Sequence, residues 1–160
     1  MSERVLNMSK ICSFFGHRTI QDKEWLQSKV ATVVEDLIEK GFTHFLFGGF
    51  GEFDELCHAV VSVKKTKYPY IQRIYCVSDE KYLKEHNRPT YLRLEDYEEF
   101  TYYAPTFNYW YTRIYYRNCE MIKRSDYVVF YAESREGSGA YKALQYAQKQ
   151  KKRYINLMVN

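Results

Sequence analysis

A short apolar run, a glycine turn and an amphipathic segment follow one another in Phe45-Leu46-Phe47-Gly48-Gly49-Phe50-Gly51-Glu52-Phe53-Asp54-Glu55-Leu56. The apolar run predicts a buried strand, and the apolar residues from Leu56 onward repeat at helical spacing. Glycines in the turn can adopt positive φ and let a ligand press against the backbone. A helix that starts there presents free N–H groups and the positive end of its dipole, which favour phosphate. The stretch therefore predicts a phosphate-binding turn between a strand and a helix.

Three acids, Glu52, Asp54 and Glu55, lie in the first turn of that predicted helix. One interpretation is that they cap the helix and complement its dipole. In the other, Glu55 hydrogen-bonds a ribose or assists cleavage of an N-glycosidic bond, where a carboxylate stabilises an oxocarbenium ion. We favour ribose binding over chemistry for Glu55.

The composition indicates one globular domain, residues 1–160, that is large enough to bury a core. Its net charge of +4 suits an anionic small molecule and does not require nucleic acid. The cysteines show no metal spacing, and Cys12 and Cys76 lie in apolar runs, which predicts buried free thiols in a reducing, cytoplasmic compartment.

Neither a signal core nor a membrane-spanning stretch is visible, so we expect no membrane partner. The histidines at 44, 58 and 86 have no ligand spacing, and we expect no metal and no cofactor.

Predicted strands and helices alternate along the chain. The strands are expected at 10–15, 45–47, 72–77, 127–131 and 154–158, and the helices at about 21–40, 52–66, 108–124 and 138–149. This order predicts an α/β fold, a Rossmann-like three-layer sandwich with a mainly parallel sheet of about five strands. In such sheets the ligand binds beyond the carboxyl ends of the strands.

Residues 78–107 do not fit the alternation, because they are polar, acidic and rich in tyrosine. We interpret them as an insertion with some local helix, which could cover the site as a lid. Tyrosine rings can stack on bases, and tyrosine is also enriched at protein interfaces. We expect most of these tyrosines to be core or subunit contacts in a homo-oligomer, with one or two facing the ligand. The tyrosines in question continue beyond residue 107 into the next predicted helix and are Tyr91, Tyr97, Tyr102, Tyr103, Tyr109, Tyr111, Tyr115 and Tyr116.

Two further turns follow predicted strands and should converge with the glycine turn at one edge of the sheet. The first, Gly16 to Thr19, offers an arginine, Arg18, that could bind phosphate in bidentate fashion. The second, Glu133 to Gly139, is either a phosphate nest formed by Gly137, Ser138 and Gly139 or an ordinary turn with Ser138 as N-cap.

One helical cation, Arg117, has two possible partners. It could reach a phosphate in the predicted site, or it could pair with the nearby acid Glu120.

Five motifs together resemble the SLOG superfamily, and most closely its YpsA-like bacterial and prophage branch. They are Ser13 to Arg18, Gly48 to Gly51, Tyr116-Arg117-Asn118, Met121-Ile122 and Ser125 to Val129, and the resemblance runs from about Ile11 to Leu157. It implies a Rossmann-like fold that binds nucleotides or nucleotide-derived ligands. The superfamily includes Lonely Guy phosphoribohydrolases, DprA-type DNA-binding proteins and sensors of NAD-derived signals in phage defence.

The Lonely Guy signature is only partly present. Gly48, Gly49, Gly51 and Glu55 match its glycines and its glutamate. Phe47 replaces its proline, Glu52 replaces its threonine, and the arginine–lysine pair that accompanies it upstream is missing. These departures favour binding without turnover.

The resemblance and the residues together predict binding of a nucleotide or NAD-derived molecule, such as an ADP-ribose-type or cyclic nucleotide signal, by a sensor or, if phage-borne, a sequestering protein. One alternative is a nucleoside 5′-monophosphate phosphoribohydrolase or N-glycosidase with Glu55 as catalytic residue. Another is a DNA-associated DprA-like protein, although the low charge leads us to expect no nucleic-acid partner. The expected ligand contacts are Gly16, His17, Arg18, Gly48, Gly49, Phe50, Gly51, Glu52, Glu55, Arg117, Ser134, Gly137, Ser138 and Gly139.

Overall fold

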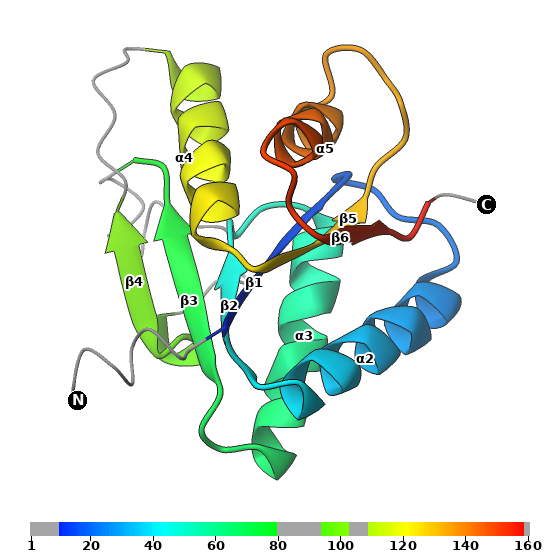
Figure 1. The fold of residues 1–160 in the computed structure, drawn as a ribbon, viewed down its shortest axis with the longest axis vertical. Coiled ribbons are helices and arrows are strands. Elements are labelled where there is room, and N and C mark those ends of the chain that lie inside the picture. The colour runs from blue at the N-terminus through cyan, green and yellow to red at the C-terminus, as the bar shows by residue number, and fades with distance from the viewer. Residues whose placement is uncertain (1–9, 80–93, 103–108, 159–160) are drawn as a thin grey trace.

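A computed structural model describes residues 10–79, 94–102 and 109–158 of the chain. Its centre is a six-stranded sheet in the order β4-β3-β2-β1-β5-β6, in which every neighbouring pair is parallel (Figure 1). The strands are β1 (Lys10–Gly16), β2 (Phe42–Phe47), β3 (Gln72–Val77), β4 (Glu99–Tyr102), β5 (Tyr127–Tyr131) and β6 (Tyr154–Asn156). The predicted Rossmann-like α/β fold is confirmed, with one strand more than expected.

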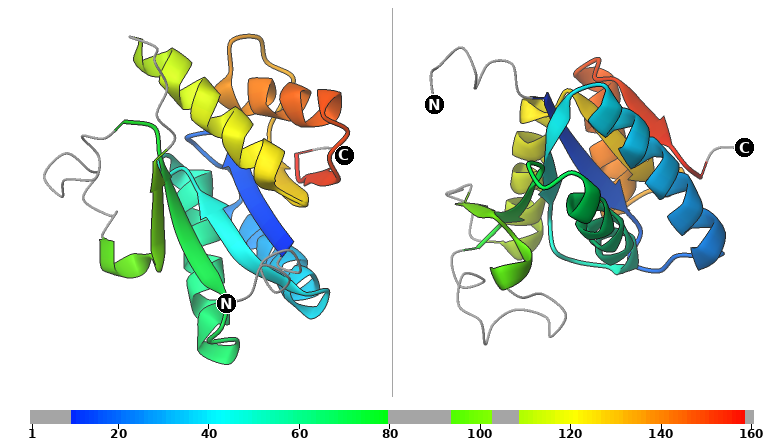
Figure 2. Two further views of the ribbon diagram at one scale, coloured as in Figure 1. Left: turned by 60° about the vertical axis from the view of Figure 1, so that its left-hand side comes forward. Right: turned by 90° about the horizontal axis from the view of Figure 1, so that it is seen from below.

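Four α-helices cover the two faces of this sheet. They are α2 (Lys23–Glu39), α3 (Glu52–Lys67), α4 (Trp110–Arg124) and α5 (Gly139–Lys149). Helices α2 and α3 lie on one face and α4 and α5 on the other (Figures 1 and 2). Successive strand residues point to opposite faces, so Phe14 packs with α2 and α3 while Phe15 packs with α4 and α5. The result is the predicted three-layer sandwich.

The switch point of the sheet lies between β1 and β5. From β1 the chain adds β2, β3 and β4 on one side, and then returns to add β5 and β6 on the other. Loops that leave β1 and β5 diverge at such a point and open a crevice beyond the carboxyl ends of the strands. The topology therefore places the β1–α2, β2–α3 and β5–α5 loops at one edge of the sheet.

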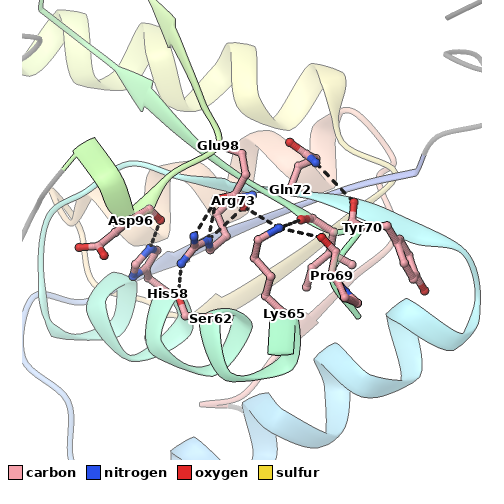
Figure 3. Close-up of polar contacts among 10 residues, drawn as sticks. His58, Ser62, Lys65, Pro69, Tyr70, Gln72, Arg73, Asp96 and Glu98 are labelled. Atoms are coloured by element: carbon pink, nitrogen blue, oxygen red, sulfur yellow. Dashed lines mark hydrogen bonds and ion pairs between the residues drawn. The ribbon is translucent and has the colours of Figure 1, made fainter. Parts of the chain in front are cut away.

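The interpretation of residues 78–107 as an insertion without a strand is wrong for part of the segment. Within it, η3 (Leu94–Asp96), a 3-10 helix, is followed by the edge strand β4, whereas 80–93 and 103–108, and with them the proposed lid, lie outside the described residues. Glu98 fixes this return to β3, because its N–H donates to the Arg73 carbonyl at 2.9 Å and its carboxylate accepts from the Arg73 guanidinium at 2.7 to 3.1 Å (Figure 3).

A second group of contacts packs the same segment against α3. The Arg73 guanidinium also donates to Ser62, and a ring nitrogen of His58 lies 2.9 Å from the Asp96 carbonyl oxygen (Figure 3). The Tyr97 ring is buried against His58 and Phe47. Tyr97 is thus a core residue, as expected for most of the tyrosines in this region.

Two further properties of the described residues concern their helices and their cysteines. Their helices all fall short of the length and apolarity that a membrane crossing requires. All four cysteines are buried and free, which includes the two thiols predicted to be so.

Candidate functional site

A cavity of about 1630 Å³ opens at the carboxyl ends of β1, β2 and β5, between α4 and α5. Residues from all three predicted loops line it. The expected contacts among its lining residues are Gly16, His17, Arg18, Gly48, Phe50, Gly51, Arg117, Gly137, Ser138 and Gly139. Four other expected contacts, Gly49, Glu52, Glu55 and Ser134, are not among the lining residues. The convergence of the loops thus follows the topology, whereas individual side chains depart from the sequence-based expectation.

Asp54 holds the glycine turn through two hydrogen bonds. One carboxylate oxygen accepts from the Gly48 N–H at 3.1 Å and the other from the Gly49 N–H at 3.0 Å. Burial raises the pKa of Asp54 to about 7, although the Arg117 charge and the two N–H groups act in the opposite direction. Two of the N–H groups expected to face phosphate are therefore bound within the protein. Of the three acids in the first turn of α3, Asp54 lines the cavity, whereas Glu55 is exposed.

Arg117 also holds the glycine turn in place. This arginine is 5% exposed, and it donates to the Gly48 carbonyl at 2.8 Å and to the Asn118 side chain at 3.0 Å. A Cβ on Gly48 would lie 2.8 Å from the guanidinium, so only glycine leaves room for this contact. Glu120, the alternative partner, pairs instead with Arg124 at 2.8 Å. The first role of Arg117 is to position the glycine turn.

Glu52 joins the first loop to the glycine turn. Its N–H donates to the Arg18 carbonyl at 2.8 Å, and its carboxylate accepts from the Ile20 N–H at 2.9 Å. Gly51 has a φ of 94°, and a Cβ on it would meet the Arg18 backbone at 3.1 Å. The two loops therefore form one unit, and the exposed Arg18 side chain lines the cavity.

His17 is buried where the first loop meets the third. Its Nε2 accepts from the Glu133 N–H at 2.8 Å, which places the hydrogen of the neutral ring on Nδ1. Burial lowers the pKa of His17, and so does the Arg135 guanidinium, which keeps the ring neutral. Arg135 Nη2 lies 3.3 Å from Nδ1. Two hydrogen-bond donors thus face one another at the cavity wall.

The start of α5 adds backbone donors to this wall. The Ser138 hydroxyl accepts from the Tyr141 N–H at 3.3 Å, so it is an N-cap. The N–H groups of Gly139 and Ala140 precede that bond and have no intrahelical acceptor. The capped turn and the phosphate nest are therefore compatible, because the hydroxyl serves the helix and the backbone remains for a ligand.

The upper part of the cavity lies between two helical walls. On α4, Tyr111 and Tyr115 line it, four residues apart and on one helical face. On α5, Lys142, Tyr146 and Lys149 line it. Tyrosines facing the site were expected, but the lysines of α5 and the pair Glu133 and Arg135 were not. The i, i+4 tyrosine spacing was visible in the sequence, whereas nothing in it marked Arg135.

Among the described residues, no group of three or more His, Cys, Asp and Glu side chains could hold a metal ion. The cavity is lined by N–H groups and cations together with two carboxylates, those of Asp54 and Glu133. Asp54 accepts from the glycine turn and Glu133 pairs with Arg135 at 3.0 Å, so the remaining donors suit an anion.

Comparison with solved structures finds this fold in DNA processing protein A, DprA. The match to DprA from Helicobacter pylori, a protein that binds single-stranded DNA, has a TM-score of 0.66 at 17% identity and covers 96% of this chain and 67% of that one. DprA from Streptococcus pneumoniae matches with a TM-score of 0.65 at 17% identity, over 94% of this chain and 50% of that one. The structural genomics target TM1055 matches with a TM-score of 0.57 at 16% identity, over 91% of this chain and 72% of that one.

These likenesses establish the fold. DprA is one of the proteins that the sequence resemblance names, so the Rossmann-like fold that the resemblance implies is confirmed. No family model matches the sequence, and a search of curated proteins gives no match. The chain spans two thirds of one DprA and half of the other.

Proposed function

We propose that this protein binds a phosphate-bearing nucleotide or NAD-derived molecule in the cavity at the switch point of its sheet. The observation that carries the proposal is the pair of facing donors, His17 Nδ1 and Arg135 Nη2, 3.3 Å apart. A neutral imidazole has one acceptor nitrogen, and the Glu133 N–H occupies it. An anionic oxygen on the cavity side of this pair, within hydrogen-bond distance of both nitrogens, would accept from both.

The phosphate position follows from the occupied and the available donors. Gly48 and Gly49 donate to Asp54, so the glycine turn offers fewer N–H groups than its sequence suggests. At the start of α5 the Gly139 and Ala140 N–H groups have no intrahelical acceptor, and the helix dipole adds to their effect. The phosphate therefore belongs beside His17, Arg135 and the first turn of α5.

Binding should be weakened by His17→Ala and should depend on pH. The change removes one hydrogen bond to a charged group, which is worth roughly 1.5–3 kcal/mol, or about tenfold or more in Kd. A bound anion favours the imidazolium, so AMP should raise the lowered pKa of His17. By linkage, affinity should rise as pH falls through that pKa. Calorimetry with AMP and ADP-ribose, and NMR titration of the ring, measure both effects.

His44→Ala is the control for this experiment. The pKa of His44 is also lowered by burial, but the residue lies on β2 and does not line the cavity. Its loss should leave the Kd unchanged. Absence of AMP and ADP-ribose binding at millimolar concentration, or a His17 ring whose titration ignores the ligand, would contradict the proposal.

A second test adds a side chain at the position where the phosphate is proposed to bind. A Cβ on Gly139 would meet no atom within 4 Å, so Gly139→Val should fold with an unchanged melting temperature. The added methyl groups should nevertheless exclude a phosphate from the first turn of α5 and weaken binding by about tenfold or more, the scale of a lost charged hydrogen bond. Gly139→Ala should have an intermediate effect. A folded Gly139→Val protein with normal affinity would move the phosphate away from α5.

Binding of single-stranded DNA is the second candidate function. It is favoured by the fold shared with the Helicobacter pylori DprA and by the cations Arg18, Lys142 and Lys149 that line the cavity. Such a complex should weaken steeply with salt, because each phosphate contact releases counterions. An affinity for oligonucleotides that is constant between low and high salt would remove this candidate. Hydrolysis by Glu55 has less support, because that side chain is exposed and outside the lining.

A further inference from the structure

The cavity is larger than one nucleotide requires. Its volume is about 1630 Å³, whereas sites for drug-sized ligands occupy about 300–1000 Å³. A phosphate beside His17 and the start of α5 would occupy only the end formed by the loops. The remaining space continues between α4 and α5, which run side by side on one face of the sheet (Figure 2).

One wall of this remaining space is aromatic. Tyr111 and Tyr115 line it from consecutive turns of α4, and their exposed fractions are 57% and 43%. The Tyr111 ring stacks on Tyr109 with centroids 5.6 Å apart and planes at 18°, which supports the ring from outside the cavity. Large aromatic surfaces that stay exposed in a folded domain mark binding sites, and tyrosine faces stack on nucleobases whatever the base.

The opposite wall is cationic. Lys142 and Lys149, two turns apart on α5, are exposed and line the cavity together with Gln145 and Tyr146. A ring-binding wall that faces a cationic wall matches a molecule in which bases and phosphates alternate. A single nucleotide held at the loops would reach neither wall fully.

We propose that the space between α4 and α5 is a subsite for a second nucleoside unit, joined through a phosphate to the nucleotide at the loops. Its base stacks on the Tyr111 and Tyr115 wall, and the linking phosphate faces Lys142. The inference rests on the proposed function, because it takes the first phosphate to lie beside His17. The shared chemistry, two nucleosides joined by phosphate, occurs in small dinucleotides and in single-stranded DNA.

A length series separates this inference from the proposed function. The probes are deoxyadenosine 5′-phosphate, the 5′-phosphorylated dinucleotide pdApdA and the corresponding octamer, measured by calorimetry at constant salt. We expect pdApdA to bind at least tenfold more tightly than the mononucleotide, from one added stacking contact. An octamer that gains only the statistical factor for its extra positions points to a small dinucleotide. A larger gain points to single-stranded DNA.

Variants of the aromatic wall complete the test. Tyr111→Ala should reduce the gain of pdApdA over the mononucleotide to near unity, and Tyr111→Phe, which keeps the ring, should restore that gain. Tyr70→Ala, at an exposed tyrosine between α3 and β3, is the matched control and should leave the gain unchanged. Equal affinities for the two probes, or a gain that survives Tyr111→Ala and Tyr115→Ala together, would overturn the second subsite alone. Failure of all three probes to bind under conditions in which AMP binds would also overturn the subsite alone. Failure of AMP and ADP-ribose as well would overturn the proposed function and the subsite with it.

Discussion

Asp54→Ala should lower the free energy of unfolding by about 2–6 kcal/mol at pH 5, because each buried N–H group left without an acceptor costs about 1–3 kcal/mol. The change removes the acceptor of two such groups, those of Gly48 and Gly49. Small domains have only about 5–15 kcal/mol in total, so this is a large fraction of the stability. Urea denaturation followed by circular dichroism gives the difference.

The neighbouring acid supplies the control. Glu55→Ala removes the same charge one residue later in α3, where the side chain is exposed and outside the cavity lining. Its cost should stay within about 0.5–1 kcal/mol, the scale of a surface change or of a lost favourable contact with the helix dipole. If the two substitutions differ by less than about 1 kcal/mol at pH 5, where two buried N–H groups without an acceptor should cost at least about 2 kcal/mol, Asp54 does not hold the turn.

The pH dependence of stability carries the same assignment. The pKa of Asp54 is raised to about 7 in the folded protein, whereas an unfolded aspartate titrates near about 4. Between these values the folded state binds the extra proton, so the contribution of Asp54 is complete below about pH 4 and is lost as pH rises through about 7. Asp54→Asn should remove this part of the pH profile. An identical profile in the parent and the variant would contradict the burial of the carboxyl group.

The alternation of apolar runs and helical periodicity was sufficient to predict the sandwich and the convergence of three loops. It failed at β4, because Glu99-Phe100-Thr101-Tyr102 is a short edge strand without a continuous apolar run. Its attachment depends on Glu98 and Arg73, which are 25 residues apart. Pairing between distant polar residues leaves no periodic signal in a sequence, so the strand was assigned to an insertion.

In the candidate site, too, the sequence pattern predicts the turn but not the partners of individual side chains. The glycines at 48, 49 and 51 mark a turn that needs special backbone conformations, and Gly49 and Gly51 do have positive φ. Sequence reasoning assigned the catalytic possibility to Glu55 because a known signature has its glutamate there. Which of two neighbouring acids points inward depends on the rotation of α3 against the sheet, and that orientation buries Asp54 and exposes Glu55.

Gly48→Ala should destabilise the protein by about 2–3 kcal/mol, because overpacking a filled interior usually costs about 1–3 kcal/mol and hydrogen bonds are lost in addition. A Cβ at this position would lie 2.8 Å from Arg117 Nη2 and 3.0 Å from its Cζ. The guanidinium would have to leave the Gly48 carbonyl, to which it donates at 2.8 Å. Gly139→Ala, where an added Cβ meets no atom within 4 Å, is the matched control and should cost nearly nothing.

A double-mutant cycle with Arg117→Met tests the cause of that loss. Arg117→Met alone should cost about 2–4 kcal/mol, because the Gly48 carbonyl and the Asn118 side chain lose a charged hydrogen-bond donor. In that background the guanidinium is absent, so Gly48→Ala should cost about 1–3 kcal/mol less than it does in the parent protein, the range of coupling between residues in contact. Urea titrations of the four proteins give the coupling energy. If the two costs add to within about 0.5 kcal/mol, Arg117 is not the reason why position 48 requires glycine. The remaining physical reason would be the approach of a ligand to the Gly48 backbone.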